Sequence, residues 1–202
     1  SLYVKNLNNI QQYIKNGVDL TKHLLGFARG GKYEISLLNL NGLIKEQNLM
    51  FGRTNKDIIF RNEARPDLWS VEADRGQIEQ VLMNLYLNAL QAMPSSGTLT
   101  TGTENVTIDQ DQYSPYYVKA GNYIKITIAD TGIGMDDDIQ QRIFDPFFTT
   151  KEMGRGTGLG LASVYGIVKN HEGFINVFSK KGQGTKFEIY LPASGKAVPA
   201  LK

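Results

Sequence analysis

The sequence predicts an α+β fold in which a long N-terminal helix precedes a region of mixed helix and strand patterns. Residues 2–29 keep nearly to a heptad of apolar positions, and residues 76–93 repeat apolar side chains at three- and four-residue spacing. Residues 98–108 and 123–129 are rich in strand-forming residues, and the second run alternates as Ile124, Ile126 and Ile128. These patterns together indicate one mixed domain with a helical appendage.

The composition and charge of the chain restrict its class. Its 202 residues are 41% hydrophobic and 21% charged, which is typical of a soluble globular protein. The formal net charge of +2 is too small to indicate a nucleic acid or an anionic membrane as a partner. The chain has no cysteine, so it has no disulfide, thiolate nucleophile or cysteine metal site, and we expect a cytoplasmic location.

The ends of the chain indicate an excerpt. The sequence begins at Ser1 rather than Met, and its first residues carry no secretory pattern. No apolar run approaches the roughly 18 residues of a membrane span. We therefore expect no direct membrane contact from this excerpt, although the parent protein could be membrane-anchored.

The predicted N-terminal helix cannot bury its apolar seam alone. Nothing else in the chain supplies a long unclaimed helix, so we expect its partner in missing sequence or in a second subunit. Gly30 and Gly31 end it. The seam consists of Leu7, Ile10, Ile14, Thr21, Leu24 and Ala28.

The next segments alternate between short strands and helices. A short apolar stretch covers residues 35–40, and Asn41 is predicted to cap a helix that ends near Phe51. Residues 57–62 are predicted to form a strand. Asp74, with Gln77 three residues later, resembles a capping box at the start of the helix over residues 76–93.

The second half of the domain is predicted to contain more strands than helices. Residues 109–121 form a hairpin loop between the two strands named above, and a helix follows over residues 158–170. Residues 174–179 and 186–191 are predicted strands. The tail from 193 to 202 is small, polar and contains proline, which is typical of a linker.

A stripe of amides follows the predicted helix over residues 76–93. Asn is a mediocre helix former, so Asn84 and Asn88 gain no local stability from lying one turn apart. An amide oxygen is a hard, neutral ligand that suits Mg²⁺, an ion usually completed by water and substrate phosphates. A polar rim on a half-exposed helix is the alternative. The stripe comprises Gln77, Gln80, Asn84, Asn88 and Gln91.

Two glycine motifs concentrate the chemistry. DTGIGM at residues 130–135 leaves a strand in a sharp turn, and its Asp130 can accept a hydrogen bond from an exocyclic amine. GRGTGLGL at residues 154–161 places glycines directly before a helix, an arrangement that directs backbone N–H groups at phosphates. Lys151 and Arg155 lie on either side of its approach. Each motif alone is also compatible with ordinary tight turns.

Four motifs in this order resemble those of sensor histidine kinases. The amide helix with Asn84 and Asn88 resembles the N box, and DTGIGM resembles the G1 box. FDPFFTTK at residues 144–151 resembles the F box, and GRGTGLGL resembles the G2 box. Their joint occurrence is far more specific than any one motif. The likeness extends to LLGFAR at residues 24–29, Asp74 and the run from 172 to 192.

This resemblance implies the domain organisation. Residues 1–31 would be a remnant of the second dimerisation helix, 32–192 the ATP-binding catalytic domain and 193–202 a linker or tail. The catalytic domain would be a two-layer α/β sandwich with helices on one face of a mixed sheet, as in gyrase, heat-shock chaperones and mismatch-repair ATPases.

The resemblance also implies the site residues. Asp130 would bind the adenine amino group, Asn88 would ligate Mg²⁺, and Asn84 would lie beside the same metal or the phosphates. A lid from about 135 to 155 would carry Lys151 and Arg155 to the terminal phosphates. Phe144 could pack over the nucleotide or belong to the core. The implied nucleotide-binding residues are Asp130, Gly132, Gly134, Met135, Phe144, Thr150, Gly154, Gly156, Thr157, Gly158, Leu159, Gly160, Leu161 and Thr185.

Within this superfamily the amide at position 84 is informative, because related ATPases carry a glutamate there. An amide has no useful basicity near neutral pH and cannot act as a general base toward water. The resemblance therefore implies that ATP is held for phosphoryl transfer rather than for rapid hydrolysis.

The acceptor of that transfer is absent from the excerpt. The H box of histidine kinases has a His followed by an acid, whereas His23 precedes two leucines and His171 lies at a helix end, where an imidazolium is favourable. We therefore expect a structural or solvated role for both histidines. The resemblance implies transfer to a His on a missing dimerisation helix of a homodimer, and then to a response regulator receiver domain. A degenerate kinase that binds ATP without transfer is the alternative.

Overall fold

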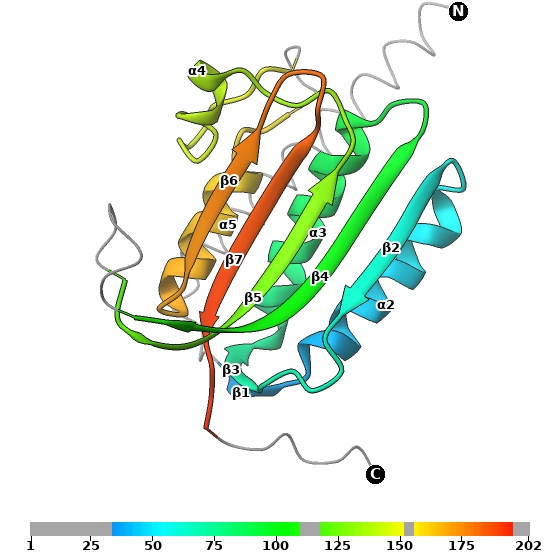
Figure 1. Cartoon of the computed structure of the whole chain (residues 1–202). Coiled ribbons are helices and arrows are strands. Elements are labelled where there is room, and N and C mark those ends of the chain that lie inside the picture. The colour runs from blue at the N-terminus through cyan, green and yellow to red at the C-terminus, as the bar shows by residue number, and fades with distance from the viewer. Residues whose placement is uncertain (1–33, 110–117, 152–155, 196–202) are drawn as a thin grey trace, which may run out of the picture.

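The computed structural model describes residues 34–109, 118–151 and 156–195. A five-stranded mixed sheet lies at its centre, and the longer helices cover one face (Figure 1). The sheet has the order β2-β4-β5-β7-β6, in which only the pairing of β2 with β4 is parallel. Its strands are β2 (Ile58–Ala64), β4 (Gly97–Ile108), β5 (Gly121–Asp130), β6 (Phe174–Ser179) and β7 (Thr185–Pro192). The predicted two-layer sandwich is therefore confirmed, whereas the predicted N-terminal helix lies outside the described residues.

Three helices form the second layer. They are α2 (Leu40–Thr54), α3 (Arg75–Ala92) and α5 (Gly160–Asn170), and a short helix, α4 (Asp137–Gln140), lies away from them above β6 in Figure 1. Two short strands, β1 (Ile35–Leu38) and β3 (Val71–Asp74), pair antiparallel near the start of α3. None of the described helices is long and apolar enough to cross a membrane.

The core lies between the sheet and α3. The three isoleucines of β5 that alternate in the sequence all face this side and are at most 2% exposed. They meet the apolar side chains of α3, which repeat at the predicted helical spacing. The α3 members of the core are Ile78, Val81, Leu82, Leu85, Tyr86 and Ala89. Periodicity therefore placed both faces of the core correctly.

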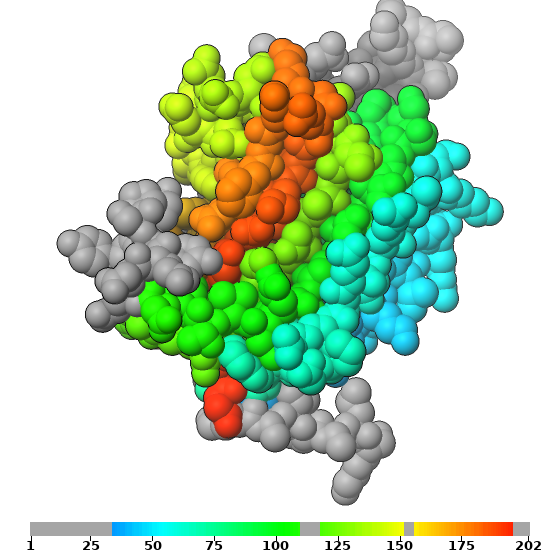
Figure 2. Space-filling model, in the orientation of Figure 1, coloured from blue at the N-terminus to red at the C-terminus, as the bar shows by residue number. Residues whose placement is uncertain are grey.

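No helix of the described part of the chain covers the other face of the sheet, as Figure 2 shows. Charged side chains pair on this face: Lys125 of β5 contacts Glu104 of β4, and along β7 the Lys186 Nζ lies 2.8 Å from a carboxylate oxygen of Glu188. A hydrophobic cluster covers the end of the strands near the hairpin of β4 and β5, and it consists of Ile108, Tyr123, Phe174 and Tyr190. This face is stabilised without a second helical layer.

The cap of α2 differs from the prediction. Asn39, not Asn41, caps this helix, because β1 ends at Leu38 and the side-chain oxygen of Asn39 accepts a 3.0 Å hydrogen bond from the Gly42 N–H. Asn41 already lies in the first turn. Its amide bridges instead to the sheet, donating to the Arg65 carbonyl at 2.7 Å and accepting from the Thr103 hydroxyl at 2.8 Å.

Candidate nucleotide-binding site

The amide stripe of α3 faces α5 and the lid segment rather than open solvent alone. Gln80 Nε2 donates to Ser163 Oγ at 3.1 Å, and Asn84 Nδ2 donates to the Gly160 carbonyl at 3.2 Å. These bonds join the middle of α3 to the first turn of α5. Part of the stripe therefore holds two helices together, a role that spacing along one helix does not reveal.

The next turn of α3 meets Lys151. The ammonium of Lys151 lies 3.4 Å from Asn88 Oδ1 and also contacts the amide oxygen of Gln91. Burial lowers the pKa of Lys151, because the charged ammonium loses part of its hydration. The structure thus brings a cation to the two amide oxygens at the end of the stripe. The sequence placed Gln91 on the amide stripe but did not predict it as a residue of the nucleotide site, where it contacts Lys151.

The DTGIGM turn packs on the C-terminal end of α3. The Ile133 N–H donates to the Ala92 carbonyl at 3.0 Å, and a side chain at Gly132 would place its Cβ 2.6 Å from that carbonyl oxygen. Gly134 has φ +64° and faces the turn between β6 and β7, where a Cβ would lie 2.0 Å from the Lys180 carbonyl oxygen. The predicted close approach is therefore an approach to the protein's own backbone.

Asp130 ends β5 beside this turn. Burial raises the pKa of its carboxyl, although backbone N–H groups of Gly132 and Thr185 oppose the effect. One carboxylate oxygen accepts the Gly132 N–H at 2.8 Å. Thr185 lies directly opposite Asp130 in the register of β5 and β7, and its hydroxyl is 2.9 Å from Ser179 Oγ. This half-buried acceptor is held in place by backbone groups.

The described part of GRGTGLGL forms the turn into α5. Gly158 has φ +66° and accepts the Phe147 N–H at 3.0 Å, which ties the turn to the F-box segment. The residue before the helix, Leu159, supplies no side-chain cap, so the first N–H groups of α5 keep donor capacity. Thr157 Oγ accepts the Leu159 N–H at 3.4 Å, and Leu161 packs against the core. Gly154 and Arg155 lie outside the described residues.

The segment between the two glycine motifs holds the remaining predicted residues. The Met135 N–H donates to Ser179 Oγ at 2.9 Å. The ring of Phe144 lies 5.4 Å from that of Tyr165 on α5, so in this structure it packs on protein. Phe147 is 66% exposed, and Thr150 is exposed as well. α4 begins with an acidic first turn, which contains Asp137 and Asp138.

His171 has a structural role, as its sequence context favours, but not as an imidazolium. It is buried at the end of α5, its Nδ1 lies 2.8 Å from the Ile167 carbonyl oxygen, and its Nε2 accepts the Asp74 N–H at 3.1 Å. An imidazolium has no acceptor nitrogen, so this geometry requires neutral imidazole. The favourable imidazolium expected at a helix end is therefore wrong here. The Asp74 N–H bonds to His171, while Asp74 still caps α3 through the Gln77 N–H at 3.0 Å.

Comparison with known proteins gives a consistent result. The family described as histidine kinase-, DNA gyrase B- and HSP90-like ATPase matches residues 73–195. Sensor kinase CckA of Brucella abortus (strain 2308) is 41% identical over 187 residues, which are 91% of this chain and 20% of that protein. This chain therefore spans about a fifth of the length of that relative.

Solved structures agree with the sequence relatives. The catalytic domain of histidine kinase ThkA in a nucleotide-free form is 31% identical with a TM-score of 0.64, and the match covers 79% of this chain and 96% of that one. ThkA in complex with the response regulator protein TrrA gives 27% identity and a TM-score of 0.71 over 94% of this chain and 51% of that one. Full-length ShkA in complex with AMPPNP gives 25% identity and a TM-score of 0.74 over 97% of this chain and 39% of that one.

Proposed function

We propose, on the premise that this chain belongs to the histidine kinase-, DNA gyrase B- and HSP90-like ATPase family, that it is the catalytic core of a sensor histidine kinase. It would transfer the γ-phosphoryl group of ATP to a His on a dimerisation helix. One observation carries the proposal: three motifs distant in sequence contact successive turns of α3. Gly160 meets Asn84, Lys151 meets Asn88, and the turn at Gly132 packs on Ala92.

Asp130 is the proposed recognition group for adenine. Its carboxylate oxygens can accept a hydrogen bond from the exocyclic amine of adenine, and the backbone N–H of Gly132 already fixes the direction of the carboxylate. Thr185 lies opposite Asp130 in the register of β5 and β7, and Gly134 follows Asp130 in the DTGIGM turn. Both would border the base.

Mg²⁺ is the proposed metal, held by Asn88 with Asn84 beside it. The donor set fits this ion because amide oxygens are hard and neutral. The described residues contain no group of three or more His, Cys, Asp or Glu side chains that could hold a metal. Such a site leaves room for water and phosphate oxygens. When bound, the ion would neutralise negative charge on the phosphates.

The phosphates are proposed to lie at the N-terminus of α5. The first N–H groups of the helix and the turn at Gly156 and Gly158 supply donors, and Lys151 approaches from the lid segment. Arg155, outside the described residues, is proposed to join it. Phosphoryl transfer needs mainly positioning and charge neutralisation, and these groups supply both.

The amide at position 84 favours transfer over hydrolysis. Asn84 donates to the Gly160 carbonyl, and it has no basic atom with which to activate water. His171 is not the acceptor in this proposal, because each of its ring nitrogens is engaged with a backbone group. We therefore propose an acceptor His on a helix of a homodimer.

A response regulator receiver domain is the proposed next partner. Support comes from ThkA, whose structure was solved in complex with the response regulator protein TrrA. We propose a cytoplasmic location for this part of the chain, with residues 1–31 as the end of the dimerisation helix and a linker within the predicted tail of 193–202. In the structure the Ser194 N–H still bonds to the Ser70 carbonyl at 2.7 Å, so any linker begins after it.

The experiment is a titration followed by a transfer assay. Nucleotide binding to the 202-residue chain is measured with and without Mg²⁺, and a separately supplied phosphoacceptor helix is then added with radiolabelled ATP. We expect Mg²⁺-dependent binding and label on the helix. Binding without label on the helix would favour the degenerate kinase, and release of phosphate to water would favour an ATPase.

A further inference from the structure

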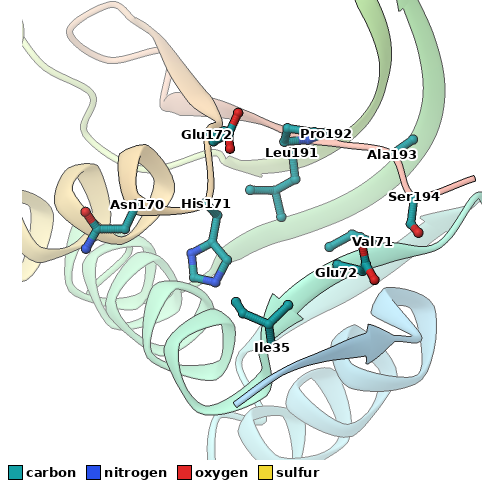
Figure 3. Close-up of a pocket in the computed structure, with 10 residues that line it drawn as sticks. All are labelled: Ile35, Val71, Glu72, Asn170, His171, Glu172, Leu191, Pro192, Ala193 and Ser194. Atoms are coloured by element: carbon teal, nitrogen blue, oxygen red, sulfur yellow. The ribbon is translucent and has the colours of Figure 1, made fainter. Parts of the chain in front are cut away.

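The ends of α3 and α5 away from the proposed nucleotide site meet at His171. Its side chain is 9% exposed and forms part of the wall of a pocket of about 310 Å³, as Figure 3 shows. A backbone N–H can only donate, so the bond from Asp74 N requires an unprotonated Nε2. The ring proton then lies on Nδ1, where it is donated to the Ile167 carbonyl.

The His171 imidazole accepts a hydrogen bond from a backbone N–H at this helix start that the Asp74 side chain does not bind, which is the N–H of Asp74 itself. One carboxylate oxygen of Asp74 accepts the Gln77 N–H at 3.0 Å, and the other accepts the Glu34 N–H at 3.3 Å. The backbone N–H of Asp74 itself goes to His171. The bond therefore fixes the backbone at the start of α3 to the last turn of α5.

The same two helices are joined again nearer the site. Gln80 bonds to Ser163, and Asn84 bonds to the Gly160 carbonyl. At about 1.5 Å of rise per residue, Asp74 and Asn84 lie about 15 Å apart along α3. A contact at each end of such a span resists both sliding and rotation of one helix against the other.

We propose that His171 is a positioning residue that keeps the proposed Mg²⁺-ATP site assembled. Its neutral imidazole holds α3 and α5 in the register at which Asn84 meets Gly160, so losing the imidazole acceptor weakens nucleotide binding at the far end of the helix pair. This inference rests on the proposed function. It assigns no contact between His171 and the nucleotide.

The bond from the Asp74 N–H to the His171 Nε2 is the contact that substitutions can remove or replace. The charged groups around the ring are the carboxylates of Asp74, Glu72 and Glu172 and the ammonium of Lys119, which pairs with Glu172. The Asp74 carboxylate is already engaged with two backbone N–H groups.

Two variants test the hydrogen bond itself. His171→Gln can still offer an acceptor oxygen to the Asp74 N–H, whereas His171→Ala offers nothing. Glu172→Gln is the control, because it removes a neighbouring charge and an exposed ion pair 3.2 Å long while leaving the imidazole in place.

The measurements are the affinity for a fluorescent ATP analogue with Mg²⁺ and hydrogen exchange of the Asp74 amide without nucleotide. We expect His171→Ala to bind about fivefold to tenfold more weakly than the parent. His171→Gln should stay within about twofold of the parent, and Glu172→Gln should match it. The Asp74 amide should exchange faster in His171→Ala than in the parent or in His171→Gln.

The inference is overturned if His171→Ala binds as the parent does, or if His171→Gln weakens binding as much as His171→Ala. It is also overturned if the Asp74 amide exchanges as slowly in His171→Ala as in the parent or, should that variant not fold, if His171→Gln binds more than about twofold more weakly than the parent. A parent that binds no nucleotide would refute the proposed function instead, whereas Asp74 exchange would still report whether His171 holds the helices together.

Discussion

The two ends of α3 are built differently. At its N-terminal end, the backbone N–H groups of Asp74 and Gln77 are bound by the His171 imidazole and the Asp74 carboxylate. Arg75 adds two ion pairs, with Glu46 and Glu79. At its C-terminal end, glycine turns bring main chain close to the helix, and the polar groups are amide oxygens, a lysine and the first N–H groups of α5. The first end is satisfied by the protein, whereas the second keeps polar groups that a ligand could use.

The glycine turns should give the largest effect on stability. Gly134→Ala would place a Cβ about 2.0 Å from the Lys180 carbonyl oxygen on a backbone at φ +64°, so the turn must move. We expect a loss of about 3 kcal/mol or more in the free energy of unfolding, together with loss of nucleotide binding. Urea denaturation and nucleotide titration measure the two effects.

Gly182→Ala is the matched control for that substitution. Gly182 also has a positive φ, +76°, but no atom lies within 4 Å of an added Cβ. Its cost should therefore be the backbone strain alone, about 1 kcal/mol, with binding retained. Equal losses in the two variants would show that close approach to Lys180 is unimportant.

The amide end should separate binding from stability. We expect Asn88→Asp to change the dependence of nucleotide binding on Mg²⁺ and to lower affinity at saturating metal about tenfold, because a carboxylate attracts the ion, pairs with Lys151 and repels phosphate. Asn88 is half-buried, so the free energy of unfolding should change by less than about 1 kcal/mol.

Leu87→Gln serves as the comparison at the adjacent position, which is 42% exposed. Isothermal titration at several Mg²⁺ concentrations should show unchanged behaviour for this variant. A metal response of Asn88→Asp that equals that of the parent would remove Asn88 from the metal site.

Much of the fold was predictable because its elements have local causes. The apolar period of α3, the alternation of β5 and the bounds of β6 follow from patterns within each segment. The partners of polar side chains were not predictable in this way. Gln80 and Ser163 are 83 residues apart, and the imidazole that binds Asp74 is 97 residues away. A single sequence contains no local signal for such pairs.

The candidate site shows the same division. The motifs identified Asn84, Asn88, Asp130 and the glycines, and the structure brings their described members to one end of α3. The motifs did not show that Asn84 also joins α3 to α5, or that Gln91 shares the lysine. Asn39 rather than Asn41 caps α2 because β1 ends at Leu38. Helix propensity does not locate the start of a helix to within two residues.

At the N-terminal end we expect a smaller, purely structural effect. Asp74→Ala removes the side-chain cap of α3 but leaves the backbone N–H that His171 accepts. The free energy of unfolding should fall by about 1 kcal/mol. Nucleotide affinity in the folded protein should change by less than about twofold, since the helix register is kept. Chemical denaturation and a binding titration would show this, and a tenfold loss of affinity would contradict it.

The smallest effect concerns Asp130 and has opposite signs for binding and stability. Burial raises the pKa of its carboxyl in the folded state, so the folded state binds the proton more tightly than the unfolded state. The contribution of Asp130 to stability is therefore full at low pH and is lost as pH rises through the folded-state pKa. At neutral pH the buried carboxylate is a cost, which Asn, with an oxygen for the Gly132 N–H, would avoid.

Asp130→Asn should accordingly raise the melting temperature at neutral pH, and the gain should shrink as the pH falls below the folded-state pKa. The same variant should bind ATP more weakly, because an uncharged amide is a poorer acceptor for the adenine amine. Melting curves across pH and a nucleotide titration test both signs. If Asp130→Asn is less stable than the parent at neutral pH, the carboxylate stabilises the fold. If the variant is more stable and binds ATP more weakly, the Asp130 carboxylate costs stability and serves ligand binding.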